Sequence, residues 1–410
     1  MNTTIYTLLI RLYGVVIYIA SFFNKKAAQW ISGRKQFPSL NLNQKSIWMH
    51  CASLGEFEQG RPVLEAMNKA FPDYPIVLSF FSPSGYEIRK NYALADKVIY
   101  LPLDTPQHAK KLIAQINPAL VLWVKYEYWL NQLTELNKNN IPILLISGQF
   151  RSSQPFFKWY GGLWKQTLSG FNQLFVQQEN SLLLLQTIQL DKIASISGDT
   201  RFDRVCEIAD HAKPIQEILN FAEQKQVIVA GSTWMKDEIL LSKFIQKNHQ
   251  AKLIIVPHEV NEKRTNEIQS LFPNAILFSE WNSETNPQAN VLIVNTIGLL
   301  SRLYQYATIT YVGGGFNKGI HNTLEAAVYG KPVLFGPHFH KFSEAIEMIE
   351  NKCAFSVNNE LEFTAIANNL LNDENLLMET GKKAKEYVYA KKGATEKIVD
   401  YVKSKRLLTK

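Results

Sequence analysis

The residues best suited to hold an anion lie between Thr310 and Pro337. Three consecutive glycines, Gly313–Gly315, follow a run of β-formers, and glycines let the backbone approach a ligand where a Cβ would intrude. Asn322 is a good helix N-cap, and Glu325 follows three residues later. A helix that begins after such a loop directs free N–H groups and its positive dipole end toward a phosphate. The stretch therefore predicts a phosphate-binding loop, with a capping box of Asn322 and Glu325 as the purely structural alternative.

The carboxylate of Glu56 is the second group that could do chemistry. It follows a predicted strand over residues 46–52, and open α/β sheets place their reactive groups on loops that leave the C-terminal ends of strands. Ser53 precedes it by three residues, so the pair could equally form a capping box at the start of a helix that runs to about Phe71. Glu56 is thus either a reactive carboxylate or a helix cap.

Two stretches of alternating strands and helices must position these groups. Alternation of this kind predicts mostly parallel sheets that helices cover on both faces. The fold class is therefore α/β, and two similar halves with a ligand loop in each suggest Rossmann-like sheets that face one another across a cleft. The predicted strands cover residues 46–52, 75–80, 97–100, 119–124, 142–146 and 173–176 in the first half, and 227–230, 252–256, 275–277, 291–294, 308–312 and 333–335 in the second.

A chain of 410 residues is too long for one core and suggests two domains. The segment from Cys206 to Gln226 carries several charges and interrupts the alternation. We therefore predict an N-terminal segment over 1–35, an α/β domain over 36–208, a linker over 209–226 and a second α/β domain over 227–410. The second domain would include a closing helix, with Gly393 as a possible break inside it.

The segment Ile5–Phe23 is strongly apolar and is interrupted only by Arg11. About 20 apolar residues span a bilayer, but an arginine near the helix centre costs about 2.5–3.5 kcal/mol on insertion scales. The segment is therefore either a signal-anchor whose basic flank at Lys25 and Lys26 keeps the remainder in the cytoplasm, or a helix that lies in the interface with Arg11 reaching the headgroups. A buried first helix is the soluble alternative. We predict membrane association.

Composition narrows the class of partner. The net charge of +8 favours acidic partners, but the basic residues are dispersed and form no block or aromatic-basic motif, which argues against nucleic acid. The three cysteines, Cys51, Cys206 and Cys353, are an odd number without CxxC spacing. We interpret them as reduced core residues and predict no metal site.

Several short motifs together resemble the lipid A Kdo transferases, a family of GT-B glycosyltransferases. No single motif is specific, but their order and spacing are, and the resemblance runs from the N-terminal segment to about Lys385. The motifs are Ser53-x-Gly55-Glu56, Glu127-Tyr128-Trp129-x-Asn131, Gly198-Asp199-Thr200-Arg201-Phe202-Asp203, Gly231-Ser232-Thr233, Val256-Pro257, and Gly313-Gly314 … His321-Asn322-x-Leu324-Glu325-Ala326-Ala327 … Gly336-Pro337.

The resemblance implies an inverting enzyme that moves 3-deoxy-D-manno-octulosonic acid (Kdo) from the donor CMP-Kdo to the lipid A precursor (lipid IVA) in lipopolysaccharide core biosynthesis. The partners would be CMP-Kdo, this phosphorylated acceptor and the inner leaflet of the cell inner membrane. The protein would lie on the cytoplasmic face and use no cofactor and no metal. An acceptor hydroxyl needs a base as it attacks the anomeric carbon, and helix N–H groups with a basic residue can stabilise departing CMP without a metal.

The resemblance also implies roles for individual residues. Glu56 would be the general base, Glu325 would bind the donor ribose, and Asn322 would hold the phosphate with Arg201 near it. The full donor set would be Thr200, Arg201, Ser232, Pro257, His258, Gly313, Gly314, Asn322 and Glu325. Ser53, Gly55 and Glu127 would contact the acceptor.

The sequence departs from the family pattern at four places. Lys125-Tyr126-Glu127 replaces an acidic Glu-Thr-Glu pattern, and His258 stands where the family has an arginine. Trp234 occupies a histidine position, and Lys341 replaces an asparagine. These departures fit a divergent branch because Glu56, Asn322 and Glu325 all remain.

Two other classes of protein stay open at this point. One is a different GT-B nucleotide-sugar enzyme, such as a UDP-sugar transferase or an epimerase. The other is a non-catalytic membrane-surface protein whose glycine loop docks a phosphate and in which Glu56 is only a cap.

Overall fold

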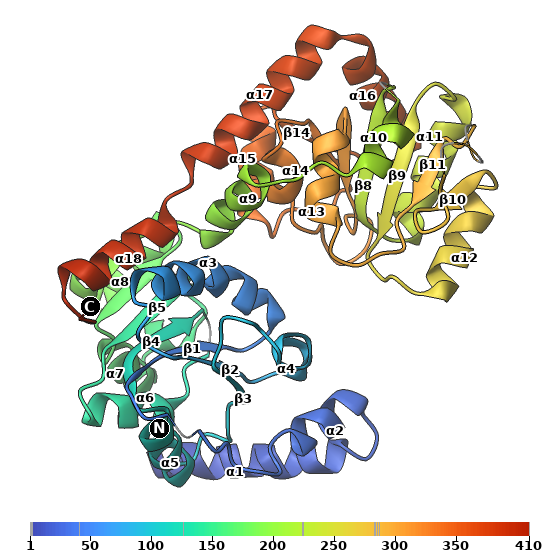
Figure 1. Ribbon diagram of the computed structural model, residues 1–410. Coiled ribbons are helices and arrows are strands. Elements are labelled where there is room, and N and C mark those ends of the chain that lie inside the picture. Colours follow the sequence, from blue (N-terminus) through green and yellow to red (C-terminus); the bar gives the residue numbers. More distant parts are fainter. Residues whose placement is uncertain are drawn as a thin grey trace. The chain divides into compact units, whose positions relative to one another are not determined.

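The computed structural model describes residues 3–40, 42–125, 127–223, 225–282, 284, 286 and 288–409. The chain divides into two compact units (Figure 1). Unit 1 comprises Met1–Asp203 together with Gly393–Lys410, and unit 2 comprises Arg204–Lys392. Tyr126, which belongs to one of the departing motifs, lies outside the described residues.

Unit 1 is built on a seven-stranded parallel sheet with the order β3-β2-β1-β4-β5-β6-β7. Parallel neighbours in a sheet need crossover connections, and helices supply most of them. The strands are β1 (Ser46–Cys51), β2 (Ile76–Phe80), β3 (Lys97–Tyr100), β4 (Pro118–Val124), β5 (Ile143–Gly148), β6 (Gln173–Val176) and β7 (Ala194–Ile196). The helices are α1 (Thr3–Ala20), α2 (Lys25–Ser32), α3 (Leu54–Ala70), α4 (Pro83–Arg89), α5 (Pro106–Ile116), α6 (Leu130–Lys138), α7 (Gly162–Ser169), α8 (Glu179–Thr187) and α18 (Ala394–Ser404). Helix α9 (Thr200–Asp210) begins in unit 1 and continues into unit 2.

Both faces of this sheet are buried, because successive side chains of a strand point to opposite faces. Trp48 of β1 belongs to a core cluster with Leu112 and Leu133 of α5 and α6. Its neighbour Met49 belongs to the cluster on the other face, with Phe57 of α3 and Val402 of α18. The continuous apolar runs of the central strands follow from this double coverage.

Unit 2 repeats the architecture with a second parallel sheet in the order β10-β11-β9-β8-β12-β13-β14. Its strands are β8 (Val227–Thr233), β9 (Lys252–Pro257), β10 (Ala275–Leu277), β11 (Val291–Ile293), β12 (Ile309–Val312), β13 (Val333–Phe335) and β14 (Ala354–Ser356). Its helices are α10 (Gln216–Ala222), α11 (Met235–Lys247), α12 (Glu262–Leu271), α13 (Leu300–Leu303), α14 (Leu324–Ala327), α15 (Ser343–Glu350), α16 (Glu360–Asn372) and α17 (Glu374–Ala390). The predicted α/β class with two parallel sheets is confirmed.

The C-terminal boundary of the second domain differs from our expectation. We predicted that residues 227–410 form one domain, but Gly393–Lys410 belongs to unit 1, where α18 packs on α3. Gly393 has a positive φ of 117°, and the carboxylate of Asp203 accepts hydrogen bonds from the backbone N–H groups of Gly393 (2.6 Å) and Thr395 (2.7 Å). These contacts end the helical run at Gly393 and return the chain to unit 1. The predicted linker over 209–226 contains α10, a helix of unit 2.

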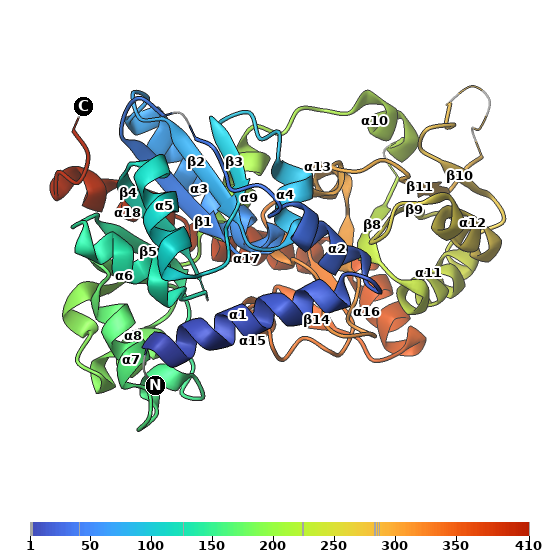
Figure 2. The ribbon, with the colours of Figure 1, turned by 90° about the horizontal axis from the view of Figure 1, so that it is seen from below.

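The N-terminal helix α1 runs along one side of unit 1 (Figure 2). By length and composition it could cross a membrane. Its inner side is attached to the domain, because the buried hydroxyl of Tyr6 donates to Asp104 (2.7 Å) and the amide of Asn131 donates to Thr7 (3.3 Å). Its outer side is apolar and about half to two thirds exposed at Ile5, Leu8, Leu9, Leu12, Val15, Val16 and Ile19. This two-sided helix is the geometry of a segment that lies on a bilayer surface.

Candidate active site

Glu56 lies in the first turn of α3, directly after β1, and is 9% exposed. Its Oε2 accepts a hydrogen bond from the backbone N–H of Ala52. Ser53 occupies the N-cap position, but its side chain makes no capping hydrogen bond, so the reciprocal capping box does not form. Cys51 at the end of β1 has its pKa raised, first by burial and then by the negative charges of Glu56 and Glu127. The carboxylate therefore has a backbone donor that fixes it at the C-terminal edge of the sheet.

Gly55 precedes this carboxylate and is exposed. A Cβ built there would meet no atom of the described residues within 4 Å. The glycine is thus not required by packing within the protein, and the space beside Glu56 is open to a substrate.

A second carboxylate, Glu127, follows β4 on the same sheet. Its Oε2 lies 3.2 Å from Nε2 of the buried His50 and accepts a hydrogen bond from Nε1 of Trp129 (2.9 Å). The other ring nitrogen of His50 lies 2.9 Å from the hydroxyl of Ser79, which itself accepts from Trp48 (2.8 Å). One hydrogen-bond direction satisfies this chain, with Ser79 donating to Nδ1 of His50 and Nε2–H donating to Glu127. The arrangement fixes the orientation of the Glu127 carboxylate.

Thr200 and Arg201 begin α9 and belong to unit 1, whereas the other predicted donor residues belong to unit 2. The hydroxyl of Thr200 is buried and donates a hydrogen bond to the carbonyl of Gln59. It also lies 3.1 Å from the hydroxyl of Ser147. The guanidinium of Arg201 is paired with Asp199 at 2.7 Å. Thr200 therefore ties the start of α9 to α3 and to β5.

The glycine loop of unit 2 leaves β12, as the sequence predicts. A Cβ at Gly313 would lie 2.4 Å from the carbonyl oxygen of Ser232, and one at Gly315 would lie 2.6 Å from the backbone nitrogen of Gly336. Gly314 has a φ of 92°, which L-residues with a side chain rarely adopt. The three glycines are therefore required because the loop packs directly against the backbone at the ends of β8 and β13.

The loop uses two of its amides within the protein, which the sequence analysis did not anticipate. The N–H of Gly313 donates to Gly231 (2.9 Å), and that of Gly314 donates to the buried carboxylate of Asp237 (2.9 Å). Asp237 also accepts from the hydroxyl of Tyr311 (2.7 Å), and burial raises its pKa. Sequence reasoning missed Asp237, although it lies three residues after Trp234 at capping spacing, because its main contact is with a loop far along the chain.

Asn322 and Glu325 lie together, but not as the predicted capping box. The amide of Asn322 donates to Oε1 of Glu325 (3.0 Å), and its oxygen accepts from the backbone N–H of Leu324 (3.2 Å). The helix that follows, α14, is only four residues long and has Thr323 as its N-cap. A dipole of so short a helix is small, so binding of a phosphate here would rest more on side chains than on the helix.

Three aromatic side chains stack beside the loop. His258 lies between Trp234 and His321, with ring centroids 4.8 and 4.3 Å apart. The indole N–H of Trp234 donates to Nε2 of His321 (3.2 Å), which requires that nitrogen to be unprotonated. Burial, and secondarily the charge of His258, lower the pKa of His321 to about 4, so this ring is neutral at pH 7. Trp234 and His258, two of the departures from the family pattern, therefore form one packed unit.

The remaining predicted donor residues lie at the same edge of the sheet. Ser232 has a positive φ of 53° where β8 ends, and Pro257 is the buried last residue of β9. The N–H of His258 donates to the carbonyl of Thr233 (3.1 Å), which joins the ends of these two strands. Lys341 is exposed. The fold thus brings Ser232, His258, Gly314, Asn322 and Glu325 to the C-terminal edge of one sheet, where open α/β sheets bind ligands.

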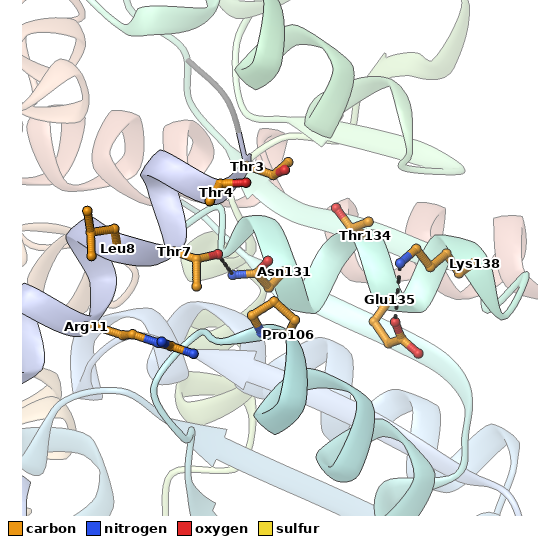
Figure 3. A pocket seen from close by; sticks show the side chains of 10 residues that line it. All are labelled: Thr3, Thr4, Thr7, Leu8, Arg11, Pro106, Asn131, Thr134, Glu135 and Lys138. Carbon is orange, nitrogen blue, oxygen red and sulfur yellow. Dashed lines mark hydrogen bonds and ion pairs between the residues drawn. The ribbon is translucent and has the colours of Figure 1, made fainter.

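Hollows flank α1 on unit 1. One of about 510 Å³ is polar, and Figure 3 shows the hydroxyl of Thr7 and the amide of Asn131 in contact there, with Arg11 reaching toward the start of α5. Arg11 makes no ion pair with the described residues. This charge within the apolar segment is therefore accommodated at the side of the helix, facing a polar hollow.

The part of the chain that the structure describes contains no cluster of metal-ligating side chains and no disulfide. No three His, Cys, Asp or Glu residues there are placed to hold a metal ion. Cys51, Cys206 and Cys353 are buried free thiols.

The fold is that of GT-B proteins. A UDP-GlcNAc 2-epimerase from Neisseria meningitidis superposes with a TM-score of 0.62 at 16% identity, over 88% of this chain and all of that one. MurG from Acinetobacter baumannii superposes with a TM-score of 0.54 at 13% identity, again over 88% of this chain. At such low identity these likenesses concern the architecture alone.

Sequence comparison points to one group of enzymes. A family model described as 3-deoxy-D-manno-octulosonic-acid transferase (kdotransferase) matches residues 29–204. The 3-deoxy-D-manno-octulosonic acid transferase of Chlamydia trachomatis serovar D is 27% identical over 373 residues, covering 88% of this chain and 86% of that protein. That of Aquifex aeolicus is 28% identical over 350 residues, covering 83% and 90%. The resemblance to the Kdo transferases is confirmed, and these relatives indicate that the chain is a glycosyltransferase.

A bifunctional glycosyltransferase/methyltransferase of Fusobacterium nucleatum is 28% identical over 370 residues. The match covers 87% of this chain but only 56% of that relative, so the chain spans little more than half of the bifunctional protein.

Proposed function

We propose that this glycosyltransferase moves Kdo from CMP-Kdo to the lipid A precursor with inversion at the anomeric carbon. Two groups of side chains, one in each unit, carry the proposal in a chain that resembles the Kdo transferases. Unit 1 presents a fixed carboxylate at Glu56 beside open space, and unit 2 presents the glycine loop with Asn322 and Glu325. Related transferases match this chain over both units.

The proposed reaction is a single displacement. The oxygen of an acceptor hydroxyl attacks the anomeric carbon of Kdo, while the bond from that carbon to the phosphate oxygen breaks and CMP leaves with the electron pair. Glu56 receives the hydroxyl proton, which makes it the general base. Glu325 holds the ribose hydroxyls of the donor, and Asn322 contacts the phosphate. Ser232 and His258 lie close enough to the same edge to complete the donor site.

Donor discrimination tests the proposal against the other GT-B enzymes. We expect labelled sugar to be transferred to the lipid acceptor from CMP-Kdo and not from UDP-sugars. The fold neighbours include epimerases named for UDP-GlcNAc, so transfer or epimerisation with a UDP-sugar and none with CMP-Kdo would overturn the assignment. Binding of CMP without any turnover would instead support a phosphate-docking protein.

We also propose that the protein lies on the cytoplasmic face of the cell inner membrane through α1. The exposed outer side of this helix supports the proposal, because a contiguous apolar surface of this kind marks a membrane or partner contact. The attachment of Tyr6 to Asp104 and of Thr7 to Asn131 supports a helix that lies on the bilayer.

Removal of residues 1–26 should release the protein from membranes and leave CMP affinity unchanged, because the donor loop belongs to unit 2 with its own sheet and core. Unit 1 should lose about 1–3 kcal/mol of stability, since the buried Asp104 loses the Tyr6 hydroxyl.

The full-length variant with Leu9→Glu and Val16→Glu tests the membrane contact of α1 without truncation. Membrane pelleting after a salt wash and calorimetry with CMP measure both effects. Retention of the truncated protein in the pellet would show that another surface holds the membrane.

A further inference from the structure

An apolar hollow of about 310 Å³ lies on the flank of α1 that faces the loop after β4. Tyr6 and Ile10 of α1 form one wall, since residues four apart lie on the same side of a helix. Phe156 and Trp164 also line the hollow. The rings of Tyr6 and Trp164 meet edge to face with centroids 5.9 Å apart. The walls offer mostly hydrocarbon and aromatic surface, which suits an alkyl chain.

The charged group on this hollow is a carboxylate. Glu127 lines its edge, and Oε2 of Glu127 is held by His50 (3.2 Å) and by Trp129 (2.9 Å). An ionised carboxylate can accept about four hydrogen bonds, so two more acceptor positions exist on this side chain. A fixed carboxylate attracts hydroxyl donors and repels phosphate. The hollow therefore fits an alkyl chain that has a hydroxyl-bearing sugar beside it.

The position of α1 makes this hollow part of the domain. The buried Tyr6 hydroxyl donates to Asp104 (2.7 Å), and Asp104 also accepts from the backbone N–H groups of Asn131 (3.0 Å) and Gln132 (2.9 Å). Asp104 thus joins the helix to the start of α6, immediately after the loop that carries Glu127. Leu9, the neighbour of Ile10, belongs to the exposed apolar side. An alkyl chain could therefore pass from a bilayer around α1 into the hollow.

We propose that this hollow binds one acyl chain of the acceptor while Glu127 accepts a hydrogen bond from the acceptor sugar. The inference rests on the proposed function, which supplies an acylated sugar as the substrate. It assigns α1 a second role, because the helix then forms a wall of the acceptor site in addition to its contact with the membrane.

The test compares an acylated acceptor with its deacylated phosphorylated disaccharide, both with CMP-Kdo and full-length enzyme. Ile10→Trp fills the hollow, and Ile88→Trp places the same side chain on an exposed position of α4 as the matched control. Ile10→Trp should raise KM for the acylated acceptor about tenfold or more, on the scale by which hydrophobic pockets discriminate, and should leave KM for the deacylated one unchanged. Ile88→Trp should behave like the parent with both acceptors.

A second variant keeps the test independent of the folding of Ile10→Trp. Trp164→Ala enlarges the hollow and should shift the preference, measured as kcat/KM, toward acceptors with longer chains. Equal KM values for Ile10→Trp, Ile88→Trp and the parent with the acylated acceptor, together with an unshifted chain preference in Trp164→Ala, would overturn the acyl-chain site while leaving the proposed function standing. A parent enzyme that transfers Kdo to neither acceptor would overturn the proposed function and this inference with it.

Discussion

Glu56→Gln is expected to lower turnover by about 10²–10⁴ while the protein folds and binds CMP normally. The glutamine oxygen can still accept the hydrogen bond from the N–H of Ala52, so the turn between β1 and α3 keeps its geometry. What the variant lacks is a group that can take the proton of the acceptor hydroxyl. Its rate should also stop falling toward acid pH, since no carboxylate remains at this position to be protonated. Steady-state kinetics over a pH series, with thermal melting as a check, measure these effects.

The matched control is Glu58→Gln, two residues further along α3. Glu58 pairs with Arg89 and Arg61, so its replacement removes surface ion pairs of small value and no proposed chemistry. A Glu56→Gln enzyme that transferred Kdo within about threefold of the parent rate would fall far short of the loss expected for a general base. The base would then have to be sought at Glu127.

Glu325→Gln is expected to weaken CMP binding by about 1–3 kcal/mol, the cost of leaving a charged hydrogen-bonding site poorly matched. The carboxylate accepts from the amide of Asn322 at 3.0 Å, and a glutamine oxygen can replace that acceptor. The local turn should therefore persist while the charge that faces the ribose hydroxyls is lost. Isothermal calorimetry with CMP measures the change directly.

Glu374→Gln serves as the control for this second variant. Glu374 lies in the first turn of α17, so both substitutions remove a negative charge near a helix start in unit 2, but Glu374 is exposed and lies outside the donor set. If the two variants bound CMP with equal affinity, Glu325 would only stabilise the turn that it forms with Asn322 and would not bind the ribose.

Sequence patterns located the central strands well, because a strand buried on both faces must be apolar throughout. The bounds of β6 (Gln173–Val176) and β13 (Val333–Phe335), both internal strands, agree with the predicted ones residue for residue. The edge strands β7 (Ala194–Ile196) and β14 (Ala354–Ser356) were missed. Each has only three residues, and one of the three is a serine, so neither carries an apolar run that identifies a strand.

The residues of the candidate site were named from the sequence and stay a prediction, whereas the contacts among them could be predicted only in part. Spacing alone indicated that Asn322 and Glu325 interact, and the structure joins them through their side chains. Spacing could not indicate that Asp237 accepts a hydrogen bond from an amide of the glycine loop, because residues 237 and 314 lie far apart in the sequence.

The most direct measurement is the mass of the product formed from CMP-Kdo and the lipid A precursor. The account predicts that the acceptor gains the mass of one or more whole Kdo residues, that CMP appears in equal number, and that both changes are nearly lost in Glu56→Gln and retained in Glu58→Gln. An acceptor of unchanged mass after incubation with the folded, CMP-binding parent enzyme would contradict it.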